Sequence, residues 1–250
     1  MRRLLGSIAV ACIGVAASAQ TVLHVSAAAD LTPVMPAIAQ AYEKETGVKL
    51  EVRFGSSATL ATQIVNGAPV DVFLAADYSF PEQVIAAGLA QEKEPVAYAN
   101  GTLVLFARKD SPIQPLTMGK LLDANVTRIA VANEFHAPYG LAAYAAMRWM
   151  KTFDALQPKL VVAENIAQTA QFVVSGNAQA GFISLTLAQS AQMKEIGTFV
   201  RVPEIYPKIR QCAVAMKKSP HLQEGLKFLI WITSEKVQSH LTDFGLSPAS

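Results

Sequence analysis

Two serines follow a glycine where an alternating apolar strand gives way to a helical pattern. Gly55 precedes Ser56 and Ser57, and the apolar residues after them recur at helical spacing. Backbone N–H groups and serine hydroxyls at a helix start can all point at one anion, which the positive end of the helix dipole also favours. The simpler interpretation is that a serine only caps its helix, and for this turn taken alone it is the better one.

Three further turns join a predicted strand to a predicted helix. They are residues 27–30 (AAAD), 137–140 (APYG) and 164–166 (ENI). In open parallel sheets ligands bind beyond the carboxyl ends of the strands, so the residues of such turns gather at one site. Pro138 suits the first turn of the helix it opens, and Tyr139 could equally pack in the core. None of the four turns contains Lys or Arg, so neutral dipoles would have to hold a bound anion.

Motifs of several enzyme and metal-site classes are missing. Phosphate-cradling glycine patterns followed by Lys, GxSxG and HExxH do not occur. The histidines are scattered without metal-ligand spacing, and a surface hydrogen bond explains His136 beside its turn. Capping explains Asp71 and Asp77, which flank a predicted strand. Trp149 and Trp231 lie on apolar helical stretches and are predicted to be core residues rather than a ligand platform.

The elements that must position these turns alternate between strands and helices. Strands are predicted at 23–28, 50–54, 70–75, 103–107, 128–132, 160–163, 181–185 and 212–216, and helices at 34–42, 60–65, 81–87, 139–150, 166–175, 222–232 and 235–244. Strand, turn and helix in repetition are typical of parallel sheets covered by helices on both faces. We expect an α/β fold with two Rossmann-like lobes of roughly 100 residues each and a ligand cleft between them.

Composition agrees with a globular chain. Of 250 residues, 52% are hydrophobic and 16% charged, which excludes intrinsic disorder and a fibrous repeat. The formal charge of +2 includes Arg2 and Arg3; without them the chain is neutral, with no long-range attraction for nucleic acid or an anionic membrane.

The first residues have the pattern of an export signal. Arg2 and Arg3 precede an apolar run over 4–17, and the small residues at 17–19 (ASA) predict cleavage after Ala19. The alternatives are an uncleaved anchor or a lipidated Cys12, although residues 9–11 (AVA) before that cysteine form a poor lipidation motif. Cleavage leaves Cys212 as the single cysteine, so no intramolecular disulfide can form and a periplasmic protein is expected.

An ordered set of motifs carries a family resemblance over nearly the whole mature chain. The most specific are residues 25–31 (VSAAADL), 54–57 (FGSS), 63–77 (QIVNGAPVDVFLAAD) and 137–142 (APYGLA). In these the chain resembles the periplasmic molybdate-binding proteins of ABC transporters, which have the type II periplasmic-binding-protein fold. The resemblance implies capture of molybdate or tungstate and delivery to a membrane permease, without catalysis, a cofactor or a metal cation, by a protein that works naturally as a monomer. It also implies lobes of residues 20–99 with 212–250 and of residues 100–211, which close on the ligand.

The resemblance places the oxyanion site at named positions of this chain. Ser57 would give a hydroxyl and an amide, Tyr139 and Ile166 would give amides, and Ser184 stands where some members carry a tyrosine. The full set of expected ligand-binding residues is Ala29, Asp30, Ser56, Ser57, Tyr139, Ile166 and Ser184.

Asp30 departs from the family pattern, in which Ser or Asn is usual. A carboxylate against a buried dianion is repulsive, and burying both without a cation costs several kcal/mol. Three interpretations follow: Asp30 turns away to cap the next helix and offers only its amide, which we favour; it is protonated and donates; or the ligand is not a molybdate-like dianion. The competing functions are binding of another oxyanion, such as sulfate or thiosulfate, and an exported dehydratase-like enzyme on the same fold.

Overall fold

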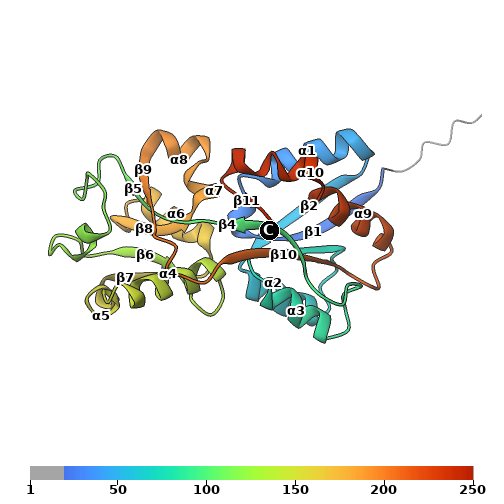
Figure 1. Cartoon of the computed structure of the whole chain (residues 1–250), viewed down its shortest axis with the longest axis horizontal. Coiled ribbons are helices and arrows are strands. Elements are labelled where there is room, and N and C mark those ends of the chain that lie inside the picture. Colours follow the sequence, from blue (N-terminus) through green and yellow to red (C-terminus); the bar gives the residue numbers. More distant parts are fainter. Residues whose placement is uncertain (1–19, 250) are drawn as a thin grey trace, which may run out of the picture.

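The computed structural model describes residues 20–249, whose strands form two sheets that lie side by side along the long axis of the molecule (Figure 1). The first sheet has the strand order β11 (Ser247–Pro248), β4 (Val96–Gly101), β10 (Ile209–Ala215), β3 (Val72–Ala75), β1 (Val22–Ala28) and β2 (Lys49–Gly55). The second has the order β7 (Leu160–Ala163), β6 (Ile129–Ala132), β8 (Ala180–Ser184), β5 (Leu103–Arg108) and β9 (Gly197–Arg201). We call each sheet, with the helices packed on it, the first lobe and the second lobe.

Helices cover both faces of the first sheet (Figure 1). One face packs against α1 (Met35–Thr46), α9 (Leu222–Ile232), α10 (Glu235–Gln238) and η4 (Leu241–Phe244), and the other against α2 (Ser57–Val65) and α3 (Ser79–Ala86). Strand β3 lies between β1 and β10, and all four of its side chains are buried. The apolar run at its centre therefore contributes to the cores on both faces.

The second lobe is built in the same way. Its elements besides the strands are η2 (Gly119–Leu122), α4 (Pro138–Trp149), α5 (Phe153–Leu156), η3 (Gln157–Lys159), α6 (Ile166–Val174), α7 (Leu185–Ala188) and α8 (Ala191–Ile196). Its core extends to Ala29 and Ala76 of the first lobe, so the two lobes are in apolar contact. The short η1 (Ala29–Leu31), which directly follows β1, packs against α6 and α7 at this contact.

The chain passes between the sheets twice, once from β4 to β5 and once from β9 to β10. These crossings lie close to the expected boundaries at 99/100 and 211/212, and the assignment of the lobes to those residue ranges stays a prediction. The expected signal segment and Cys12 lie outside the described residues. Between residues 20 and 249, no helix has both the length and the apolar character needed to cross a bilayer.

The sheets are mixed, which corrects the expectation of parallel sheets. Strands β1, β2 and β3 are parallel, as are β6, β7 and β8, but β10 runs antiparallel to β3 and β4, and β5 runs antiparallel to β8 and β9. Strands β4, β9 and β11 and the short helices α5, α7 and α8 were missed. Trp149 is 68% exposed, so its assignment to the core was wrong: it is the last residue of α4, and no element covers it.

Candidate oxyanion-binding site

Three helix N-termini meet at a small cavity between the lobes. Helices α2, α4 and α6 begin there, and η1 approaches from the end of β1. The cavity is lined by Ala28, Ala29, Asp30, Gly55, Ser56, Ser57, Ala76, Ala137, Tyr139, Asn165 and Ile166. The cavity is small, with about 10 Å³ open to the centre of a water molecule, so the lobes must separate for any ligand larger than water to enter. Six of the seven expected ligand-binding residues line this cavity.

The two serines of the α2 turn have different tasks. Ser56 is the N-cap: its Oγ accepts from the Thr59 N–H at 3.2 Å, so the capping interpretation is correct for this serine. Ser57 is the first residue of the helix, and its Oγ accepts from the Ala76 N–H at 3.1 Å. Among the hydrogen bonds of residues 20–249, the Ser57 hydroxyl accepts but does not donate. Its hydrogen is therefore available to a ligand oxygen.

Tyr139 and Ile166 lie in the first turns of α4 and α6, where backbone N–H groups have no partner within the helix. The Asn165 side chain caps α6 by accepting from the Gln168 N–H at 2.9 Å. Gly140 lets α4 start close to the sheet, because a Cβ there would meet the Ala132 carbonyl oxygen at 2.4 Å. Helices α2, α4 and α6 thus direct free amides and positive dipole ends at one cavity.

Asp30 corrects the interpretation that we favoured from the sequence. Its carboxylate is completely buried and caps no helix. Instead, Oδ2 accepts from the Tyr139 hydroxyl at 3.1 Å and from the Gln211 amide, while Oδ1 has no hydrogen-bond partner. Asp30 lies inside η1, and its carboxylate meets Tyr139 and Gln211 in the interface between the lobes.

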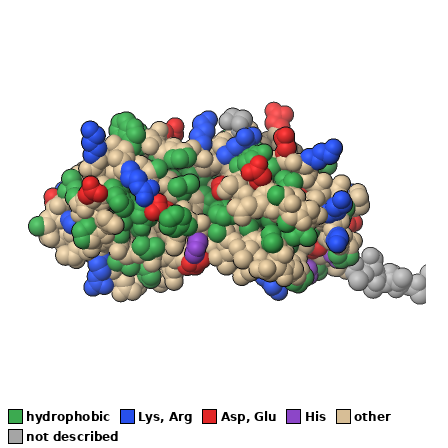
Figure 2. Space-filling model, turned by 90° about the horizontal axis from the view of Figure 1, so that it is seen from below, with side chains coloured by type: hydrophobic (Ala, Val, Ile, Leu, Met, Phe, Trp, Pro, Cys, Tyr) green, Lys and Arg blue, Asp and Glu red, His purple; other side chains and the backbone are tan. Residues whose placement is uncertain are grey.

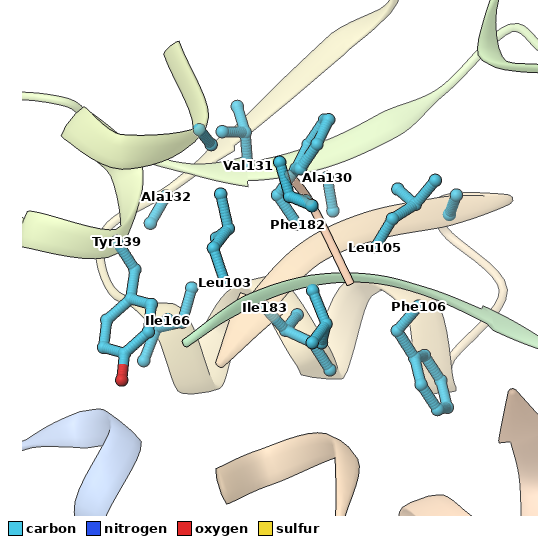
Figure 3. Close-up of a cluster of buried hydrophobic side chains, with 14 of the residues drawn as sticks. Leu103, Leu105, Phe106, Ala130, Val131, Ala132, Tyr139, Ile166, Phe182 and Ile183 are labelled. Atoms are coloured by element: carbon cyan, nitrogen blue, oxygen red, sulfur yellow. The ribbon is translucent and has the colours of Figure 1, made fainter. Parts of the chain in front are cut away.

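Gln211 and Tyr98 extend this network and were missed as site residues. The Tyr98 hydroxyl donates to Gln211 Oε1 at 2.8 Å, and Gln211 Nε2 also donates to the Tyr139 oxygen at 3.2 Å. Figure 3 shows Tyr139 at the edge of the second-lobe core, with its hydroxyl pointing away from the apolar side chains. The signal in the sequence was a glutamine directly before the apolar residues 212–215 of β10, because a buried amide needs partners.

Burial raises the pKa of Asp30 from its ordinary 3.8 to about 7, and the hydrogen bonds from Gln211 and Tyr139 only partly oppose this. Burial also raises the pKa of the Tyr139 and Tyr98 phenols well above their ordinary value, so both stay neutral. The neutral carboxylic acid is therefore a substantial form of Asp30 near neutral pH.

Ser184, the seventh expected residue, does not line the cavity. It is the N-cap of α7, where its Oγ accepts from the Leu187 N–H at 3.3 Å and shares a hydrogen bond with the Thr186 hydroxyl. Thr186 in turn donates to the Asp30 carbonyl oxygen at 2.7 Å. Ser184 is therefore connected to the site only indirectly, by the hydrogen bonds that link it to Thr186 and Thr186 to the η1 backbone.

Glu164 joins the lobes at the rim of the cavity. Its Oε1 accepts from the hydroxyls of Thr59 at 2.8 Å and Ser56 at 3.3 Å, both in the first lobe. His136 Nδ1 lies 3.0 Å from Glu164 Oε2, which confirms the expected surface hydrogen bond of this histidine. The hydrogen bond with His136 is the main reason that the pKa of Glu164 is lowered.

Within residues 20–249, no Lys or Arg lines the cavity, as the four turns predicted. Figure 2 shows that cationic side chains are scattered over the face in view rather than gathered into a basic patch. In the part of the chain that the structure describes, no group of His, Cys, Asp and Glu is arranged to hold a metal ion. The positively polarised groups at the lining are therefore the backbone N–H groups at the helix N-termini.

A larger groove lies elsewhere, on the first lobe between α1 and α9–η4, with a volume of about 540 Å³. Its lining is mostly apolar and holds no convergence of helix N-termini, so it lacks the groups that an oxyanion requires.

Comparisons with known proteins agree with this geometry. The sequence pattern of the bacterial extracellular solute-binding proteins matches residues 23–247. The molybdate-binding protein of Azotobacter vinelandii is 37% identical over 216 residues, which cover 86% of this chain and 83% of that protein. This chain belongs to the molybdate-binding protein family of the extracellular solute-binding proteins.

Further relatives agree. The molybdate-binding protein of Rhodobacter capsulatus is 34% identical over 87% of this chain and 85% of its own length. The solved structure of the periplasmic molybdate-binding protein of Azotobacter vinelandii superposes with a TM-score of 0.84 at 30% identity, covering 91% of this chain and 100% of that one. The two-lobed fold of periplasmic binding proteins is thereby confirmed for this solute-binding protein. Because these relatives are binding proteins, the predicted non-enzymatic role is confirmed over the exported enzyme.

Proposed function

We propose that this solute-binding protein captures molybdate or tungstate in the cavity between its lobes and delivers it to the permease of an ABC importer. The observation that carries the proposal is the convergence of three helix N-termini and the Ser57 hydroxyl on a cavity that no Lys or Arg lines. The relatives from Azotobacter vinelandii and Rhodobacter capsulatus are molybdate-binding proteins, which supports molybdate as the ligand. Tungstate has the same shape and charge as molybdate, so the same donors serve both.

Neutral donors suffice for a dianion when there are enough of them. Each charge-assisted hydrogen bond contributes roughly 1.5–3 kcal/mol net, and donors fixed before binding lose little further entropy. We assign donor roles to the Ser57 hydroxyl and to the amides of Ser57, Tyr139 and Ile166. Ala29 and Asp30 would contact the ligand from η1, Ser56 would hold the start of α2, and Ser184 would act through Thr186.

The same arrangement gives selectivity by size. Sulfate has the charge and shape of molybdate but is smaller, so donors on opposing lobes would be stretched around it. The hydrogen bonds that already join the lobes at Glu164 and Asp30 support a closed complex in which the ligand bridges Ser57 and Tyr139. We infer that the permease recognises this closed form.

Export and assembly complete the proposal. Residues 1–19 would direct the chain to the periplasm and be removed there, in keeping with its likeness to the periplasmic molybdate-binding protein of Azotobacter vinelandii. The cavity is built from a single chain, so a monomer is sufficient for capture.

A thermal-shift panel on the mature protein tests the proposal, with molybdate, tungstate, sulfate, phosphate and chromate as ligands. Stabilisation follows RT ln(1 + [L]/Kd), so a tight ligand in excess adds several kcal/mol. We expect large shifts with molybdate and tungstate and a small shift with sulfate. No response to molybdate and tungstate would overturn the proposal, and a dominant sulfate response would reassign the ligand.

A further inference from the structure

The two carboxylate oxygens of Asp30 have different surroundings. Oδ2 accepts hydrogen bonds from the Tyr139 hydroxyl and the Gln211 amide. Oδ1 is completely buried without any hydrogen-bond partner, in a residue that lines the oxyanion cavity. A buried oxygen without a partner is costly, so the position of Oδ1 calls for a partner that enters with the ligand.

Among residues 20–249, no cationic side chain is a partner of the Asp30 carboxylate. The titratable groups that face Asp30 are the phenols of Tyr139 on α4 and Tyr98 on β4, and the Cys212 thiol lies beyond them on β10. Burial raises the pKa of Cys212 to about 11, so all three are neutral at physiological pH. Helices α6 and α7, which pack on η1, contain no ionisable side chain. The charged residues of β2 are Lys49, Glu51 and Arg53, and in the sheet they lie opposite residues 22–26 of β1, before the strand end that leads into η1. Glu164 and His136 lie at the rim of the cavity, where Glu164 contacts both Ser56 and His136.

An ionised Asp30 beside a dianion would place three negative charges in one desolvated site. The neutral dipoles of the site replace the hydration shell of the dianion. They do not compensate for a further buried charge, which costs several kcal/mol. A proton on Oδ1 removes that charge and turns the unpartnered acceptor into a donor.

We propose that Asp30 binds the ligand as the neutral carboxylic acid, with the Oδ1–H group donating to an oxyanion oxygen, so that the site takes up the dianion together with one proton. This inference rests on the proposed function and assigns the protonation state in which Asp30 contacts the ligand. In protein whose Asp30 is ionised before binding, the proton comes from the buffer, and no bond within the oxyanion breaks. The bound site then carries a net charge of −2 from the ligand alone.

Calorimetric titration of the mature protein with molybdate tests this, at pH 6 and pH 8, each in two buffers of different ionisation enthalpy. The pKa of about 7 predicts an affinity about ten-fold lower at pH 8 than at pH 6 and uptake of about one proton at pH 8. Asp30→Asn keeps an acceptor for Tyr139 and Gln211 and directs an amide donor at the ligand. We expect it to bind with the same affinity at both pH values and without proton uptake.

Asp77→Asn is the matched control. Burial also raises the pKa of Asp77, but this carboxylate accepts from Ser79 and Phe80 and does not line the cavity. The control is expected to keep the ten-fold pH dependence of the parent.

The outcomes separate the possible failures. Binding by the parent without pH dependence or proton uptake overturns the inference and leaves the proposed function standing, whereas no binding of molybdate at either pH overturns the proposed function. Loss of binding by a folded Asp30→Asn at both pH values also overturns the inference. It would mean that an ionised Asp30 accepts a hydrogen bond from a protonated ligand. If Asp30→Asn does not fold, proton uptake at pH 8 by the parent and by Asp77→Asn still supports the inference, and its absence in both overturns it.

Discussion

The hydroxyl of Thr59 donates to Glu164 Oε1 at 2.8 Å and so joins the first turn of α2 to the loop between β7 and α6 in the opposite lobe. Ser56 donates to the same carboxylate oxygen, and the Ala58 N–H donates to the His136 carbonyl oxygen at 3.1 Å. These contacts lie at the rim of the cavity, and of the residues that make them only Ser56 also lines it. They hold the lobes together without any ligand atom. We therefore expect them to slow the dissociation of a bound ligand.

Replacing Glu164 by Ala removes the acceptor that both hydroxyls share. The Glu164 side chain is 48% exposed, and exposed polar pairs contribute about 0.2–1 kcal/mol, so we expect molybdate to bind about 1.4- to 5-fold more weakly. The loss should lie in a faster dissociation rate, measured by stopped-flow displacement. Glu134→Ala is the control, because Glu134 pairs with Arg148 within the second lobe. An unchanged dissociation rate for Glu164→Ala would show that this contact does not hold the closed form.

Ser57 and Ser184 provide a comparison between a proposed donor and a buried helix cap. Ser57→Ala removes the available hydroxyl from the cavity, and loss of one charge-assisted bond predicts an affinity for molybdate lower by about 10- to 150-fold. Ser184→Ala removes the cap of α7 and should lower the melting temperature by a few degrees, with affinity within about three-fold of the parent. Calorimetry and thermal unfolding check both, and equal affinity losses would place Ser184 in contact with the ligand.

Asp30 makes the stability of the ligand-free protein depend on pH. The folded-state pKa of about 7 lies above the ordinary 3.8, so folding favours the protonated acid. The stabilisation is fully present below about pH 3.8 and is lost progressively as the pH rises to about 7, by an amount on the order of 4 kcal/mol. Asp30→Asn should lack this loss and exceed the parent in free energy of unfolding at pH 8. Parallel pH profiles of the two proteins in urea titrations would contradict the burial of an ionisable Asp30.

Gly140 allows α4 to approach the sheet, and Gly140→Ala should disturb both the helix and the site. The new Cβ would meet two backbone carbonyl oxygens, those of Ala132 at 2.4 Å and Asn133 at 2.5 Å, which cannot move as a flexible side chain would. We expect a melting temperature lower by several degrees and weaker binding of molybdate, because the Tyr139 amide moves with the helix. Gly119→Ala is the control, since its Cβ would meet nothing within 4 Å. Wild-type stability and affinity in Gly140→Ala would refute the tight approach of α4.

Features encoded within a few consecutive residues were predictable from the sequence. Ser57 at a helix start and Tyr139 and Ile166 in first turns follow from local turn chemistry, and the structure places all three in the cavity lining. The strands β1, β2 and β3 were predicted for the same reason, because alternation and apolar runs are local patterns. Strands β4 and β9 were missed, and the pairing that makes them strands is with β10 and β5, which lie in distant parts of the chain.

The sequence by itself therefore determined which donors the four turns carry and that these turns contain no Lys or Arg, because side-chain type and helix starts are local properties. Only the tertiary structure decided what Asp30 does. Its partners Tyr139 and Gln211 are 109 and 181 residues away along the chain, and the burial that raises its pKa comes from the meeting of two lobes. Desolvation and long-range hydrogen bonds depend on how distant segments pack, which no local pattern encodes.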